Sequence, residues 1–213
     1  MSFLKLSLLI LVFTLAVFSL SGKAEPTFLT RRPRTRPYIE ATCKTTHYPT
    51  LCFQYLSMFP DSTIQSPQQL AQVSLSVSLY RAQFTRSYML KVAGELKAEK
   101  AKDYQLVKDC LDQINDGVEQ LSQSITELRR LGGQESPVKD DAFWHISNVE
   151  SWVSAALTDA TTCVDAFPGR NMSKLKATIK GKVLNVAQTT SNALALFHRY
   201  AAIYRSRASN QKP

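Results

Sequence analysis

The chain has 213 residues and a formal net charge of +9 at pH 7. This length suits one domain with its own hydrophobic core, and a basic protein attracts nucleic acid, anionic membranes or acidic polysaccharides. Only seven glycines are present, and no GxSxG, Walker or GxGxxG sequence occurs, which excludes the common serine-hydrolase and nucleotide-binding motifs.

Residues 1–24 have the layout of a cleavable secretory signal peptide. Lys5 precedes a mostly apolar run over residues 6–20, and small residues follow at 21–24. The run is shorter than the roughly 20 residues that span a bilayer, so we expect a secreted, extracellular protein with no membrane contact and no nucleic-acid partner. Removal of this segment takes away Lys5 and Lys23, which lowers the net charge to about +7.

Residues 25–37 are predicted to be a disordered basic arm. Within it, PTFLTRRPRTRP holds three prolines and four arginines in twelve residues, a composition that does not pack a core. The arm is either a plain solvated tail or a loose electrostatic contact to an acidic matrix. Residues 38–67 contain Pro49, Pro60 and Pro67 and therefore form only brief helices, a short N-terminal helical extension.

Four longer segments follow, and each repeats apolar residues at helical spacing. The first, over about 68–97, is the least regular, while the other three alternate steps of three and four, as in left-handed bundles. Short connections favour antiparallel neighbours. We therefore expect an all-α, antiparallel up-down four-helix bundle over 68–207, without strands, and a tail at 208–213. The four apolar stripes are Leu70, Val73, Val77, Tyr80 and Phe84; Val107, Leu111, Ile114, Val118, Leu121, Ile125 and Leu128; Ile146, Val149, Val153, Ala156, Ala160, Cys163 and Phe167; and, after Gly181, Val183, Val186, Thr190, Ala193, Phe197, Tyr200 and Tyr204.

The four cysteines, Cys43, Cys52, Cys110 and Cys163, predict two disulfides, because an even count in a secreted chain rarely means free thiols or a metal site. Three pairings are possible. In the hairpin of the second and third helices, Cys110 and Cys163 lie at similar distances from the turn, offset by about 4.5 Å. A Cys110–Cys163 bond can therefore close the open end of this hairpin, which leaves Cys43 and Cys52 to close a small loop.

Residues with catalytic chemistry are scattered. His47, His145 and His198 fall in different segments and are expected to be lone surface histidines. We therefore predict no catalytic residue, no metal and no cofactor. The sequon Asn171-Met172-Ser173 predicts an N-glycosylation site between the third and fourth helices. The carboxylates of the second helix are expected on a solvated face: Asp109, Asp112, Asp116 and Glu119.

The outward positions of the third and fourth helices are small and uncharged, unlike those of an ordinary solvated helix. Such side chains lose little entropy when covered, and the centres of interfaces are depleted of charge. We expect these faces to be covered by the 38–67 extension, by a partner, or by both in different parts. The candidate partner-binding residues are Asn148, Ser151, Thr158, Thr162, Asn185, Gln188 and Asn192.

Four sequence stretches in order resemble the plant invertase and pectin methylesterase inhibitor family. They are YIEATCKTTHYPTLC at 38–52, KDCL at 108–111, ISNVESWVSAALT with TC at 146–163, and TSNALAL at 190–196. The resemblance implies the pairings Cys43–Cys52 and Cys110–Cys163, a four-helix bundle with an N-terminal extension, and a non-enzyme that binds its target one to one.

The resemblance also implies a partner in the plant cell wall. The run at 190–196 and the basic charge look more like the pectin methylesterase branch, and the Pro-Lys-Phe type motif of invertase inhibitors is not found. We therefore expect an apoplastic inhibitor that covers the substrate cleft of pectin methylesterase, with acid invertase as the alternative target. A hypothesis of another class is a wall protein that holds acidic pectin through Arg31, Arg32, Arg34 and Arg36.

Overall fold

The computed structural model describes residues 35–60, 62–131, 141–169 and 171–210. These residues form six helices and no strand: α2 (Thr35–Cys43), α3 (Pro49–Leu56), α4 (Pro67–Ala98), α5 (Tyr104–Arg130), α6 (Ala142–Ala166) and α7 (Lys174–Asn210). The expected signal peptide and nearly all of the expected arm lie outside the described residues. The last three residues of that arm belong to α2, because a proline such as Pro37 is tolerated in the first turn of a helix.

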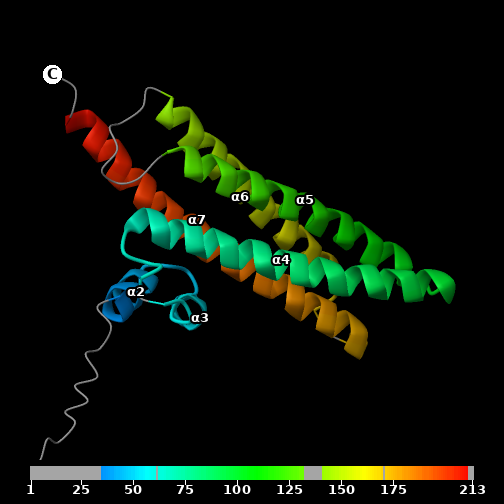
Figure 1. Ribbon diagram of the computed structural model, residues 1–213. Helices are drawn as coiled ribbons and strands as arrows, with labels where there is room; N and C mark the ends of the chain where they lie inside the picture. The colour runs from blue at the N-terminus through cyan, green and yellow to red at the C-terminus, as the bar shows by residue number, and fades with distance from the viewer. Residues whose placement is uncertain (1–34, 61, 132–140, 170, 211–213) are drawn as a thin grey trace, which may run out of the picture. The chain divides into compact units, whose positions relative to one another are not determined.

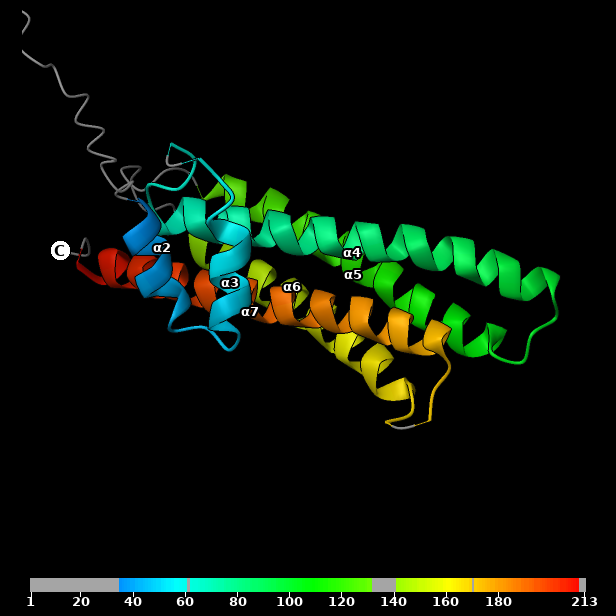
Figure 2. The ribbon, with the colours of Figure 1, turned by 90° about the horizontal axis from the view of Figure 1, so that it is seen from below.

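The four long helices form an up-down bundle (Figure 1), as predicted. Helix α4 packs against α5 and α7, and α6 packs against the same two helices from the opposite corner. The short helices α2 and α3 lie beside α4 and α7, as the view from below shows (Figure 2). None of the described helices is long and apolar enough to cross a membrane.

The predicted apolar stripes of the second, third and fourth bundle helices are all buried in the common core. The stripe predicted for α4 is wrong. Tyr80 and Phe84 are exposed, and Leu70 and Val73 are buried against the extension instead of the bundle core. Helix α4 is covered on two sides, by the bundle and by the extension. Its bundle side includes small residues that contribute little to an apolar pattern, so the sequence did not locate that side. The α4 core residues are Ala71, Leu75, Ala82, Met89, Val92, Ala93 and Leu96, with Ser78 and Thr85 buried among them.

Helix α7 begins at Lys174, earlier than the predicted start after Gly181. Ser173 caps this end, since its hydroxyl accepts a hydrogen bond from the backbone N–H of Lys176 at 3.3 Å. Gly181 lies inside the helix and faces open space, where its unfavourable helix propensity costs only about 1 kcal/mol. The helix also runs to Asn210, three residues past the expected end of the bundle at residue 207.

Both predicted disulfides are present. Cys43–Cys52 joins α2 to α3, with the two Cα atoms 5.6 Å apart, and Cys110–Cys163 joins α5 to α6, with the Cα atoms 4.9 Å apart. The extension has a small core of its own on the bundle surface, to which Leu196 of α7 contributes. This core consists of Ile39, Cys43, Cys52, Leu56, Ile64, Leu70, Val73 and Leu196.

Candidate functional site

The neutral face of α6 is exposed. Ser151, Thr158 and Thr162 lie on the solvent side of the helix, and Asn148 is half-buried at its edge. The hydroxyl of Thr158 donates to the backbone carbonyl of Ser154 at 3.0 Å. Helix α3 packs on α4 and α7, and α2 packs on α3. This face therefore offers short, conformationally restricted polar side chains that lose little entropy when a partner covers them.

The neutral face of α7 is largely covered by the chain itself. Asn192 is only 4% exposed, and its amide holds the backbone of Tyr48: Oδ1 accepts from the Tyr48 N–H at 3.0 Å and Nδ2 donates to the Tyr48 carbonyl at 2.9 Å. Asn185 Oδ1 accepts from the Tyr55 hydroxyl at 3.2 Å and from Arg81 Nε at 2.7 Å. Of the two coverings expected from sequence, the extension accounts for this part, and Asn185 and Asn192 act as latches for it. Gln188 is half-buried.

A charged network that sequence reasoning missed lies at the end of the α5–α6 hairpin. Glu127 is 5% exposed and contacts His145 of α6 and Arg130, whose Nη1 donates to Oε1 at 2.7 Å. His145 Nε2 lies 3.1 Å from Asp141 Oδ2. His145 is therefore not the lone surface histidine that was expected. Asp141 lies four residues before it in the sequence, whereas Glu127 comes from another helix, and spacing along the chain gave no signal for that contact.

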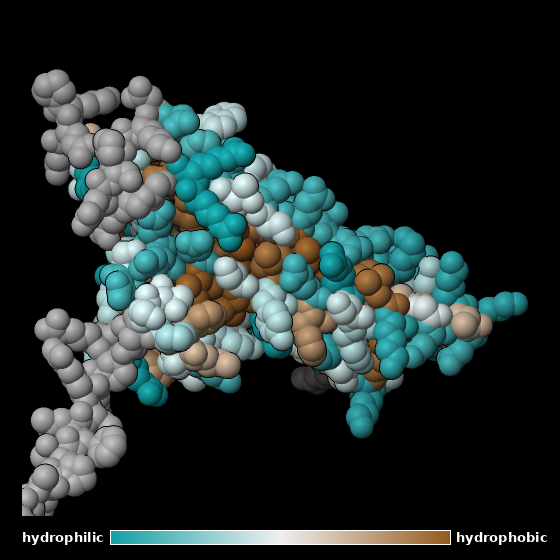
Figure 3. Space-filling view, viewed as in Figure 1, coloured by the Kyte–Doolittle hydropathy of each residue, from teal (hydrophilic) through white to brown (hydrophobic). Residues whose placement is uncertain are grey.

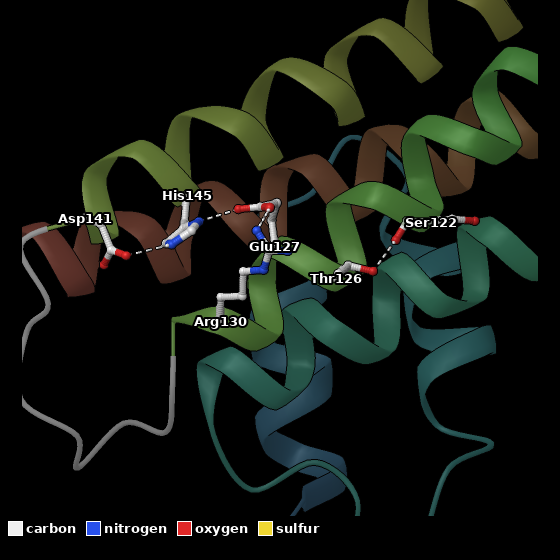
Figure 4. A network of polar contacts seen from close by, with 6 residues as sticks. All are labelled: Ser122, Thr126, Glu127, Arg130, Asp141 and His145. Atoms are coloured by element: carbon white, nitrogen blue, oxygen red, sulfur yellow. Dashed lines mark hydrogen bonds and ion pairs between the residues drawn. The ribbon is translucent and has the colours of Figure 1, made fainter.

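Figure 4 shows why this network is structural. The imidazole bridges carboxylates of α5 and the start of α6, while the nearest drawn hydroxyls, Ser122 and Thr126, lie on the far side of Glu127. Both hydroxyls donate to carbonyls of their own helix, at 2.8 and 3.1 Å. A nucleophile must be within hydrogen-bond reach of its base, and here neither hydroxyl is paired with His145.

The titratable groups with shifted pKa values do not gather into one site. Burial raises the pKa of Tyr38 on α2 and of Tyr200 on α7, whereas a hydrogen bond to Asp112 raises that of Lys108 on α5. Burial also raises the pKa of Asp159 on α6, helped by the charge of Asp116 and opposed by a hydrogen bond from Gln120. Perturbed pKa values cluster in catalytic sites, but none of these four groups is among the causes of another's pKa shift. The described residues also contain no group of three side chains that could hold a metal ion.

Asn171 is exposed and has a positive φ of 56°. It precedes the first turn of α7, where Ser173 of the same sequon caps the helix. An exposed position in a loop is what N-glycosylation needs. Glycosylation of Asn171 stays a prediction.

The described residues combine a disulfide-bonded helical bundle with an exposed face of short polar side chains that a partner could cover. The chain belongs to the plant invertase/pectin methylesterase inhibitor family, whose model matches residues 37–196.

Similar proteins support this assignment. The chain is 36% identical to pectinesterase inhibitor 11 of Arabidopsis thaliana, over 93% of this chain and 96% of that protein. It is 38% identical to pectinesterase inhibitor 9 of the same plant, over 89% and 93%. It is also 40% identical to a 21 kDa protein of Daucus carota, over 78% and 84%. A crystal structure of a mutant pectin methylesterase inhibitor from Arabidopsis has the same fold, with a TM-score of 0.57, 18% identity and coverage of 75% and 95%.

Proposed function

We propose that this protein is a secreted inhibitor of pectin methylesterase that binds the enzyme one to one in the plant cell wall. The observation that carries the proposal is the 36–38% identity, over about nine-tenths of the chain, to two proteins named pectinesterase inhibitors. Relatives named as inhibitors also support the expectation that the chain is not itself an enzyme. Inhibition then requires only that the bundle block access of the polymer to the enzyme.

The α6 face is the surface that we assign to the enzyme. It presents Asn148, Ser151, Thr158 and Thr162. Helix α6 carries no Lys or Arg, and its charged residues are the acidic Glu150, Asp159 and Asp165. Neutral polar side chains pair with backbone and side-chain groups of a partner without the desolvation cost of a charge. Gln188 is the one α7 candidate not latched to the extension by a described hydrogen bond, and it completes the proposed surface. Asn185 and Asn192 are left out, because the extension occupies them.

A paired inhibition assay tests the function. The oxidised protein, purified after secretion, is titrated against a plant pectin methylesterase and, separately, against an acid invertase. We expect loss of methylesterase activity with a one-to-one end point, and unchanged invertase activity. Inhibition of invertase alone would show that the protein inhibits acid invertase, the alternative target, and not pectin methylesterase. Full activity of both enzymes at micromolar inhibitor would end the proposal.

A further inference from the structure

Five side chains from three helices alternate between aromatic and cationic on the α3–α4–α7 side of the bundle. Lys182 Nζ of α7 lies 4.8 Å from the ring centre of Phe84 and 4.7 Å from that of Tyr88. Arg81 Cζ lies 5.6 Å from the ring centres of both Phe84 and Tyr55. These five residues, Tyr55, Arg81, Phe84, Lys182 and Tyr88, form what we call the aromatic–cation ladder.

The ladder is partly open to solvent. Phe84 is 46% exposed, Tyr80 one turn before it on α4 is 62% exposed, and the other four ladder side chains are half-buried. Figure 3, viewed as in Figure 1, shows apolar patches among hydrophilic side chains on this face of the molecule. Exposed apolar patches rimmed by polar groups are typical of binding sites.

The charge around the ladder is segregated. Helix α7 carries seven Lys and Arg residues and no Asp or Glu, and α4 carries no acidic residue before Glu95. Helix α6, at the opposite corner, carries three acidic residues and no basic one. Among the described residues, no carboxylate is paired with Arg81 or Lys182. Arg81 is therefore held by aromatic rings and by Asn185, and Lys182 is held by aromatic rings. The positive charge of both side chains is left unneutralised.

We infer that the aromatic–cation ladder binds a polyuronate, the de-esterified acidic form of pectin. Sugar rings have flat apolar faces that pack on exposed aromatic rings, and the uronate carboxylates complement Lys182 and Arg81. Only the choice of this polymer rests on the proposed function, because it is the product of the enzyme that we propose as the target. None of the five ladder residues belongs to the arginine-rich segment 25–37.

The test measures binding of the full protein to polygalacturonate oligomers. The ladder variant is Lys182→Gln with Phe84→Gln. Its matched control, Lys91→Gln with Leu90→Gln, removes one cation and one exposed apolar side chain from α4 outside the ladder. We expect the ladder variant to bind roughly tenfold more weakly and the control to bind within about twofold of the native protein. Fully methyl-esterified pectin should not bind, and thermal melts of both variants verify folding.

Three outcomes would overturn the inference. The control could lose as much affinity as the ladder variant, which would mean that only net charge matters. Replacement of Arg31, Arg32 and Arg34 by Gln could abolish binding while the ladder variant retains it. Anionic vesicles or duplex DNA could bind more tightly than the oligomers through the same residues. Inhibition of pectin methylesterase is measured alongside and should not change in the ladder variant, so the inference and the proposed function can fail independently.

Discussion

Asp159 of α6 lies in surroundings that disfavour its charge. Its Oδ2 atom is buried without a hydrogen-bond partner, and burial is the main cause that raises the pKa of this carboxyl above its usual 3.8. The folded protein therefore holds this proton more tightly than the unfolded chain does. The stability that this provides is present in full below pH 3.8 and is lost as the pH rises through the raised pKa.

Replacement Asp159→Asn should therefore stabilise the protein at neutral pH. The amide keeps the shape of the side chain but removes the charge and its repulsion by Asp116. Because solvent screens a partly exposed carboxylate, the gain should be below about 1 kcal/mol at pH 7, or at most roughly 2–4 °C in Tm. Thermal melts at pH 7 and at about pH 3 measure it. An equal gain at both pH values would show that charge is not the cause.

Gly117 of α5 faces Ala156 of α6. A methyl group at this position would lie 3.8 Å from the Ala156 Cβ, an ordinary van der Waals distance. Gly117→Ala should therefore raise the free energy of unfolding by about 0.5–1 kcal/mol, because it improves helix propensity without a clash. Gly94→Ala, in open space on α4, is the control and should give a similar gain. A loss at Gly117 alone in urea unfolding would mean that the helices pack more tightly than described.

At the scale of the elements, Asn192 holds the extension to α7 through both hydrogen bonds to Tyr48. Asn192→Ala leaves the Tyr48 N–H and carbonyl without these partners, and should cost about 1–3 kcal/mol. The cost should be local, so we expect faster proteolysis and faster amide exchange within α2 and α3. Ser191→Ala, which removes only a 3.3 Å contact to His47, should change both rates little. Equal effects of the two variants would remove Asn192 from its role as a latch.

The packing of each helix explains which of its core residues could be predicted from the sequence. Helices α5, α6 and α7 each bury one face, so a single apolar stripe located their core residues correctly. Helix α4 buries a second face under the extension, and its core side holds Ala71, Ser78 and Ala82, so its stripe was misplaced. The start of α7 depended on the cap at Ser173, which apolar periodicity does not detect. Latches such as Asn192 join residues 144 positions apart and could not be read from spacing.

At the scale of the whole molecule, the bundle separates its surfaces. The α4–α7 side is basic and carries exposed rings, whereas α6 presents neutral hydroxyls and acidic residues. The sequence showed that the outward positions in the middle of α6 and α7 are neutral. Only the packing of α3 on α7 shows which of these two faces the extension covers. Because the extension covers the neutral face of α7, the neutral face of α6 is the one open to a partner. The proposed docking surface depends on this assignment.

One measurement tests that assignment most directly: the inhibition constant toward pectin methylesterase of two matched variants. Thr158→Arg places a large charge in the middle of the α6 face. Thr178→Arg makes the same change on α7, at an exposed threonine whose hydroxyl donates to its own helix in the same way. We expect Thr158→Arg to weaken inhibition by a factor of about ten or more, while Thr178→Arg stays near the native value. Native-like inhibition by Thr158→Arg, or equal losses in both variants, would contradict the account.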